Sequence, residues 1–126
     1  MNPKDYIHIY DTEASSYKTI VYKEAPITSV NQIDDFFDYL EELSANQNFH
    51  IIIDLSDTNL PSAEVRSTLK NRFEKLNNKI MSYHVYIGPN FLLKIAVRYV
   101  GASLGLRDFK VHNSIENALD YINRSI

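Results

Sequence analysis

The chain contains no cysteine, and only three of its 126 residues are glycine. The lack of cysteine excludes disulfides, thiolate zinc sites and a cysteine nucleophile. The three glycines, Gly88, Gly101 and Gly105, do not form a phosphate-binding loop of either the P-loop or the dinucleotide type. No uninterrupted apolar run reaches about 18 residues, so the sequence offers no membrane span. These absences exclude several common classes of enzyme and any protein anchored by a transmembrane helix.

The composition is that of an ordinary globular protein with a small negative charge. Hydrophobic residues make up 44% of the chain and charged residues 23%, which argues against disorder. The net charge of −3 argues against nucleic acid as a partner, because nucleic-acid-binding proteins normally carry a basic face. The first residues, MNPKDYIHIYD, show no apolar signal-peptide core. We therefore expect a single domain over residues 1–126 that resides in the cytoplasm.

The spacing of apolar residues predicts a pair of strands followed by alternating helices and strands. Strands are expected over 6–10, 19–23, 49–55, 82–88 and 109–112. Helices are expected over about 30–45, 62–80 and 90–104, and from Ser114 toward the carboxyl end. The order β-β-α-β-α-β-α-β-α predicts an α/β fold with a mixed, mostly parallel sheet and helices packed on it.

A cluster of polar residues follows the apolar strand IIID and forms the first candidate site. Its members are Asp54, Ser56, Asp57, Thr58 and Ser62. Loops at the carboxyl ends of parallel strands commonly meet ligands and partners, so this loop is a candidate binding or regulatory site. A Ser/His/Asp triad can be drawn from Ser62, His112 and Asp54, but the G-x-S-x-G elbow that exposes a nucleophile is missing. The pattern therefore favours a non-catalytic protein, with Ser62 acting as a helix N-cap.

Four histidines fall on or beside the expected strands: His8, His50, His84 and His112. None of them is paired locally in the H-x-H or H-x₃-H spacing that often marks a zinc site. His50 and His84 lie near the starts of their strands and His112 lies at the end of another, which predicts opposite edges of the sheet. We therefore expect neither a metal site nor a cofactor.

The segment NFLLKIAVRYVGASLGL, which is expected to be helical, has apolar residues on more than one side. Phe91, Leu92, Ile95 and Tyr99 are the candidate residues of an apolar interface or pocket. A helix that only covers a sheet needs an apolar arc of somewhat more than about 100°. The surplus suggests a dimer seam, a partner protein or an apolar ligand, while burial beneath neighbouring helices would also account for it.

Two short motifs resemble a known family in the places where its fold requires them. Asp54-Leu55-Ser56 gives the DLS that ends a central strand, and FKVHNSIENALDYI gives a short strand, a capping residue and a final helix. In both motifs and in element order the chain resembles the STAS domain of anti-sigma factor antagonists, and more closely the SpoIIAA-like group of small single-domain bacterial proteins. The resemblance implies a regulatory module that binds a partner protein through the loop over residues 56–62.

The chain departs from this family at the phosphorylation motif. Antagonists switched by anti-sigma kinases carry DSSG at the start of the second helix, whereas this chain has LPSAEV. Ser62 is the one serine at this place and no glycine follows it, so the usual phosphorylation signal is missing from the loop.

Two further expectations follow from the apolar helix and the family likeness. The first is a homodimer, with the helix over 90–104 at its seam. The second is an alternative function as a Sec14-like carrier or sensor of a lipid or another small apolar ligand, because SpoIIAA-like domains are similar to Sec14-type domains in overall architecture. Native mass spectrometry separates the two, since a carrier retains its lipid and an interaction module forms an empty dimer.

Overall fold

The computed structural model describes residues 5, 7–10, 17–23, 29–45, 47–56, 62–88 and 109–124. The strands are β1 (Ile7–Tyr10), β2 (Lys18–Lys23), β3 (Phe49–Asp54), β4 (Ile80–Tyr86) and β5 (Phe109–His112). The helices are α1 (Val30–Ser44), α2 (Ala63–Leu76) and α4 (Ile115–Arg124). Within the described residues, no helix is long and apolar enough to cross a membrane. The helix expected over 90–104 lies outside the described residues.

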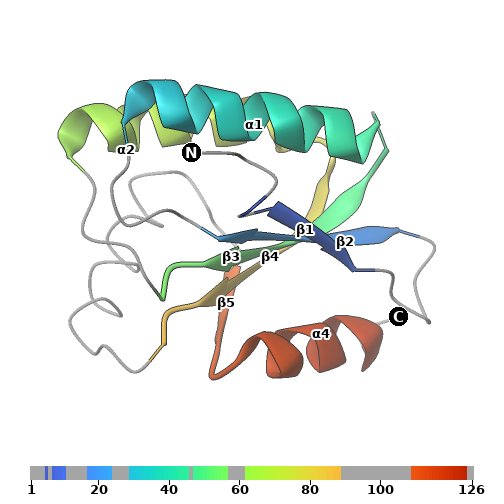
Figure 1. Cartoon of the computed structure of the whole chain (residues 1–126). Helices are drawn as coiled ribbons and strands as arrows, with labels where there is room; N and C mark the ends of the chain where they lie inside the picture. Colours follow the sequence, from blue (N-terminus) through green and yellow to red (C-terminus); the bar gives the residue numbers. More distant parts are fainter. Residues whose placement is uncertain are drawn as a thin grey trace.

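The five strands form one sheet in the order β1-β2-β3-β4-β5. β1 runs antiparallel to β2, and every later pair is parallel. Helices α1 and α2 lie on one face of the sheet and α4 lies on the other (Figure 1). We refer to these as the α1/α2 face and the α4 face. The mixed, mostly parallel α/β architecture expected from the sequence is confirmed.

The α1/α2 face holds the larger core, and it is built from aromatic and branched side chains. In α1, Phe36, Phe37 and Leu40 repeat at helical spacing and are almost completely buried. The ring of Phe37 meets the ring of Phe73 of α2 edge-on, with 5.0 Å between centroids. Because successive strand residues point to opposite faces, Ile51 and Ile53 of β3 join this core while Ile52 does not.

The α4 face holds a smaller apolar cluster. Its buried members are Val21, Ile52, Ala118 and Ile122, with Ile115 and Leu119 packed against them. The backbone N–H of Asn117 donates to the Ser114 hydroxyl at 3.0 Å, so the expected cap of this helix is confirmed. The rest of this face carries polar side chains from β3, β4 and β5, which are described below.

The expected end of the second helix is wrong. The apolar spacing extended it to Ile80, because Ile80 follows Leu76 by one helical turn. The helix instead ends at Leu76, and the backbone N–H of Lys79 donates to the Leu76 carbonyl in a turn. Ile80 begins β4 and pairs with Phe49 of β3. Burial of Ile80 in the sheet satisfies the same apolar requirement that a longer helix would have met.

Candidate functional site

The carboxyl end of β3 is fixed by a compact polar turn. Oδ1 of Asp54 accepts hydrogen bonds from the backbone N–H of Ser56 at 2.9 Å and from the Ser56 hydroxyl at 2.6 Å. The backbone N–H of Leu55 donates to the Tyr86 carbonyl at 2.8 Å, which ties this turn to the end of β4. An Asp that bonds to the backbone two residues ahead sets the shape of a loop. Asp54 therefore holds the start of the loop in place.

Gly88 lies against this turn from the end of β4. Its φ of 76° is in the left-handed region that favours glycine. A Cβ added at Gly88 would lie 3.2 Å from Cβ of Ser56, so these two residues approach closely. Ser56 and Gly88, which follow β3 and β4, therefore lie side by side, as expected for neighbouring parallel strands.

Ser62 begins α2 as its N-cap. The Ser62 hydroxyl accepts a hydrogen bond from the backbone N–H of Val65 at 3.3 Å, which confirms the expected cap. Ser62 itself is exposed, as is Glu64 in the first turn of the helix. We refer to Asp54, Ser56, Ser62 and Gly88 together as the rim.

The other predicted site residues lie outside the described residues. They are Asp57 and Thr58 of the loop, and Phe91, Leu92, Ile95 and Tyr99 of the expected apolar helix. The apolar interface, the homodimer and the pocket for a lipid therefore stay predictions. The triad drawn from Ser62, His112 and Asp54 is not assembled, because each of the three bonds to a different group.

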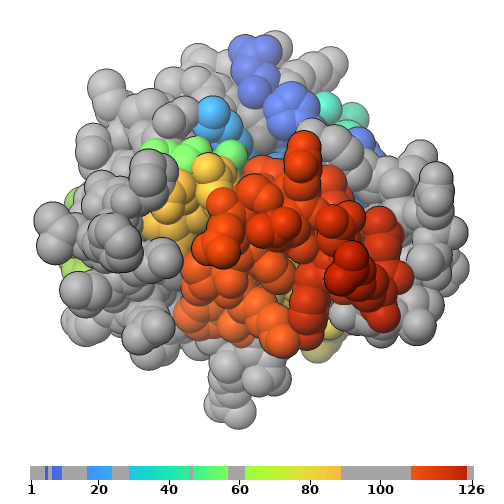
Figure 2. Space-filling view, turned by 90° about the horizontal axis from the view of Figure 1, so that it is seen from below, coloured from blue at the N-terminus to red at the C-terminus, as the bar shows by residue number. Residues whose placement is uncertain are grey.

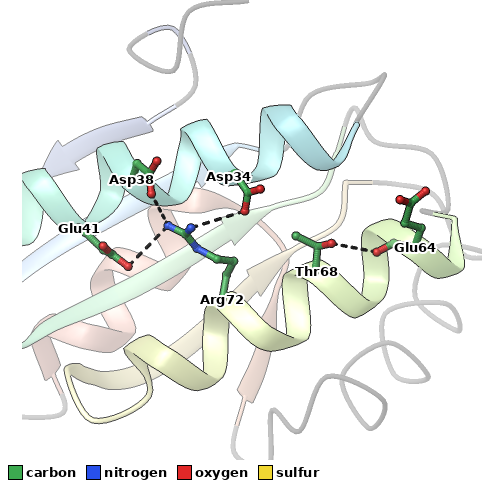
Figure 3. Close-up of polar contacts among 6 residues, drawn as sticks. All are labelled: Asp34, Asp38, Glu41, Glu64, Thr68 and Arg72. Carbon is green, nitrogen blue, oxygen red and sulfur yellow. Dashed lines mark hydrogen bonds and ion pairs between the residues drawn. The ribbon is translucent and has the colours of Figure 1, made fainter.

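The acidic α1 and the basic α2 are joined by one arginine (Figure 3). The Arg72 guanidinium lies 2.7 Å from Asp38, 3.5 Å from Asp34 and 3.6 Å from Glu41, all on α1. The same guanidinium lies over the ring of Phe37, 5.5 Å from its centroid. Part of the charge contrast between the two helices therefore stabilises their packing and is not available to a partner.

Three of the four histidines are connected across the α4 face, and the expectation that they lie at opposite edges is wrong. Nδ1 of His50 lies 2.6 Å from the Ser82 hydroxyl, which lies 2.7 Å from Nε2 of His84. Nδ1 of His84 in turn lies 2.9 Å from Nε2 of His112. We call these four residues the histidine–serine chain. The strands are short enough for a diagonal row of side chains to run from the start of β3 to the end of β5.

The strand register explains how the histidine–serine chain crosses the sheet. His50 pairs with Ser82, His84 pairs with Lys110, and His112 pairs with Tyr86. A register shift between Phe49 and His50 brings Ser82 opposite His50. Ser82 and His84 are two residues apart and therefore point to the same face. Each link thus joins side chains on the same strand or on adjacent strands.

The neutral forms of the histidines are favoured in this setting. The pKa of His84 is lowered to about 4, chiefly by burial and in addition by the neighbouring His112, His50 and Lys110. Burial also lowers the pKa of His112, as does Lys110, and burial lowers the pKa of His50. A buried imidazolium loses its hydration, and neighbouring positive charge adds to the cost.

Helix α4 covers the far end of the histidine–serine chain with an aromatic ring. The ring centroid of Tyr121 lies 5.6 Å from that of His84 and 5.4 Å from that of His112. The Lys110 ammonium lies over the Tyr121 ring, 4.3 Å from its centroid. Figure 2 shows β5 and α4 as one continuous orange and red surface, with parts of β3 and β4 visible beside it.

The described residues do not contain a group of three or more histidine, cysteine, aspartate or glutamate side chains placed to hold a metal ion. In the histidine–serine chain, ring nitrogens face one another or a hydroxyl at hydrogen-bond distance and do not converge on a common point. The histidine–serine chain is therefore a row of hydrogen-bonded side chains.

Sequence reasoning did not single out Ser82, Gly88, Lys110 or Tyr121. The S-x-H spacing of Ser82 and His84 within an expected strand was the available signal, because period two places both side chains on one face. The contacts to His50 and His112 depend on the register of three strands. The sequence placed Gly88 in a loop at the carboxyl end of a strand, but its contact with Ser56 was not predicted.

Comparisons with known proteins identify the fold. No family model matches the chain, and no curated protein matches it. A protein of the DUF3478 family with a SpoIIAA-like fold, from Shewanella loihica PV-4, is 18% identical, with a TM-score of 0.65 over 91% of this chain and 90% of that one. The NMR structure of the protein TM1081 is 14% identical, with a TM-score of 0.62 over 92% of this chain and 87% of that one.

These likenesses establish the class of the protein at the level of its fold. Both structures cover nearly the whole chain at low identity, so they show a shared architecture. The chain has a SpoIIAA-like α/β fold, as the DLS motif and the carboxyl-terminal pattern implied.

Proposed function

We propose that the protein is a non-catalytic regulatory module that binds another protein through the rim and the first turn of α2. The observation that carries this proposal is the double hydrogen bond from Ser56 to Asp54. The polar atoms of Asp54 and Ser56 fix the turn at the end of β3, and the Asp54 oxygen that bonds Ser56 is not free to act as a base. A preorganised surface loses little conformational freedom on binding, which favours association.

The fold and the placement of the rim support the same proposal. The rim lies at the carboxyl ends of two parallel strands, where α/β proteins commonly meet their partners. The resemblance to anti-sigma factor antagonists implies protein binding at this loop. Exposed lysines on α2, such as Lys70 and Lys75, and exposed acids on α1, such as Asp35 and Glu42, add opposite charges on adjacent helices. Such a field favours one orientation of an approaching partner.

Site-specific photo-crosslinking in cells tests the proposal directly. A photo-reactive residue replaces Glu64, which is exposed beside Ser62, and in a control it replaces Asn78, which is exposed beyond the other end of α2. We expect a discrete cross-linked protein from position 64 and none from position 78. Equal cross-linking from both positions, or cross-linking from position 78 alone, would contradict binding at the rim.

A pair of charge substitutions then tests whether the identified partner contacts the rim. Ser62→Asp keeps an oxygen that can cap α2 but adds a negative charge to the surface. Ser67→Asp adds the same charge to an exposed position farther along the same helix. We expect Ser62→Asp to weaken binding of the purified partner by about tenfold, which corresponds to about 1.4 kcal/mol, and Ser67→Asp to leave it unchanged. Unchanged affinity in both variants would count against the rim as the contact.

A further inference from the structure

The histidine–serine chain contains three hydrogen-bond links: His50 to Ser82, Ser82 to His84, and His84 to His112. Each link needs one hydrogen. The serine hydroxyl supplies one hydrogen, and the imidazole nitrogens supply the other two. Since a neutral imidazole has one N–H and one acceptor nitrogen, the neutral chain satisfies all three links. It does so in two ways, with all three hydrogens pointing toward His112 or all three toward His50.

One added proton also fits the chain. If His84 is charged, its two N–H groups donate to Ser82 and to His112, and the Ser82 hydroxyl donates to His50. If His50 or His112 is charged, the hydrogens of the other links reorient and every link again holds one hydrogen. The excess proton is therefore shared among the three rings through the links that join them.

A second added proton does not fit. In every doubly protonated arrangement four hydrogens are available for three links, so either two N–H groups face each other or the Ser82 hydroxyl loses its acceptor within the row. The arrangement with both His84 and His112 charged places two N–H groups in a link that is only 2.9 Å long. This link joins β4 to β5 directly beneath Tyr121 of α4.

We propose that the histidine–serine chain accepts one proton and not two, and that the second proton releases α4 from the sheet. This is a conformational device distinct from the proposed binding site, because the rim lies at the carboxyl ends of β3 and β4 whereas the device acts on the packing of α4 against the sheet. Release of α4 would uncover Val21 and Ile52, the apolar side chains that it buries. Exposure of the apolar side chains on the α4 face would then depend on pH.

Charged and titratable groups from the neighbouring elements lie around the histidine–serine chain. Tyr17, just before β2, contacts the His50 ring edge-on, and Lys23 of β2 lies on the same face. Asp54 on β3 and Tyr86 on β4 share a rung with His112, and one oxygen of Asp54 already bonds to Ser56. Lys110 on β5 lies beside His84, and Tyr121 is the titratable group of α4 in contact with the rings. The other titratable or charged groups of α4, Glu116, Asp120 and Arg124, are exposed.

NMR of the whole protein with ¹⁵N-labelled histidine tests the proposal. The ring nitrogen shifts of each histidine and the amide shifts of α4 are followed from pH 8 to pH 4. We expect the shifts of His50, His84 and His112 to change together in a first step, as coupled groups do. The amides of α4 should change in a second step at lower pH. The ring of His8, which is exposed on β1, is followed in the same spectra as a reference outside the row.

Three variants separate the proposal from simple loss of structure. Ser82→Ala removes the middle of the chain, so His50 should titrate independently of His84 and His112. Ser82→Thr retains the hydroxyl and should preserve the joint titration. His112→Gln retains a hydrogen-bonding group that does not titrate, so the α4 step should move to lower pH by about one unit or disappear.

The control for these variants is His8→Gln, which should change neither step. Joint titration that persists in Ser82→Ala would overturn the sharing of a proton along the chain. An α4 step at the same pH in His112→Gln and in the unaltered protein would overturn the link between the second proton and the release of α4. If Ser82→Ala does not fold, comparison of Ser82→Thr with His112→Gln still decides the second point.

Discussion

The two faces of the sheet are built on different principles. The α1/α2 face buries a continuous set of aromatic and branched side chains beneath two helices. The α4 face buries four apolar residues beneath one helix and beside them carries a row of histidines. On the first face, burial raises the pKa of Tyr83 to about 12, far from neutral pH. On the second face, burial lowers the pKa values of His50, His84 and His112 from an ordinary value that lies near neutral pH. This difference predicts that mildly acidic pH hardly changes the stability of the α1/α2 face. The stability of the α4 face should fall in the same pH range.

The largest expected effect comes from the centre of the α1/α2 face. Phe37 is completely buried, and its ring contacts those of Tyr22 and Phe73. Phe37→Ala should lower the free energy of unfolding by about 3–5 kcal/mol, because it removes the ring and leaves a cavity. Urea denaturation at pH 7.5 and pH 5.5 measures this change. The loss should be the same at both pH values, and a loss that differed by more than about 1 kcal/mol would contradict the separation of the two faces.

A matched pair in β3 compares the faces directly. Ile51 and Ile52 are adjacent and completely buried, but Ile51 belongs to the α1/α2 core and Ile52 to the α4 cluster. Ile51→Ala should cost about 3–4 kcal/mol and Ile52→Ala about 2–3 kcal/mol, since a small cluster collapses more readily around a cavity. Urea denaturation measures both. A larger loss for Ile52→Ala would show that the α4 face contributes more to stability than its size suggests.

Much of this architecture was predictable from local patterns. Ile33, Phe36 and Leu40 repeat at helical spacing, and α1 lies within one residue of the range that this spacing predicted. The end of α2 was not predictable, because Ile80 suits both a helix and a strand by its apolar character. Only pairing with Phe49 decides between them.

The candidate site was predictable in part, because some of its contacts are local in sequence. Asp54, Ser56 and Ser62 are close in sequence, and their roles in a turn and a helix cap follow from local geometry. The contact of Gly88 with Ser56 and the histidine–serine chain depend on strand register. A shift of one residue would turn His84 to the other face of the sheet. Residue spacing within a single strand cannot specify that register.

The pH dependence of stability should be the next largest effect. The pKa of His84 is about 4 in the folded protein and about 6.5 when the chain is unfolded. The unfolded state therefore binds the proton first as the pH falls. The stabilisation is complete above pH 6.5 and is lost progressively toward pH 4. We expect the free energy of unfolding to fall by about 1–2 kcal/mol between pH 7 and pH 5.

Urea denaturation of the unaltered protein and of His84→Gln tests this dependence. The variant should show a shallower decline over the same range, even if it is less stable at pH 7. The exposed His8 provides the control, because His8→Gln should leave the decline unchanged. Equal slopes for the unaltered protein and His84→Gln would remove His84 as the source of the acid sensitivity.

The smallest expected effects come from the two helix caps above the α1/α2 face. Ser29 and Gln32 form a reciprocal capping box at α1, whereas Ser62 makes a single, longer bond at α2. Because the box satisfies two backbone N–H groups, Ser29→Ala should cost about 1–1.5 kcal/mol and Ser62→Ala about 0.5–1 kcal/mol. Urea denaturation should give the same losses at pH 7.5 and pH 5.5, since neither cap contains a group that titrates in this range. A pH-dependent loss in Ser62→Ala alone would instead show that the start of α2 senses acid. The acid response would then extend from the histidine–serine chain to the surface proposed to bind a partner.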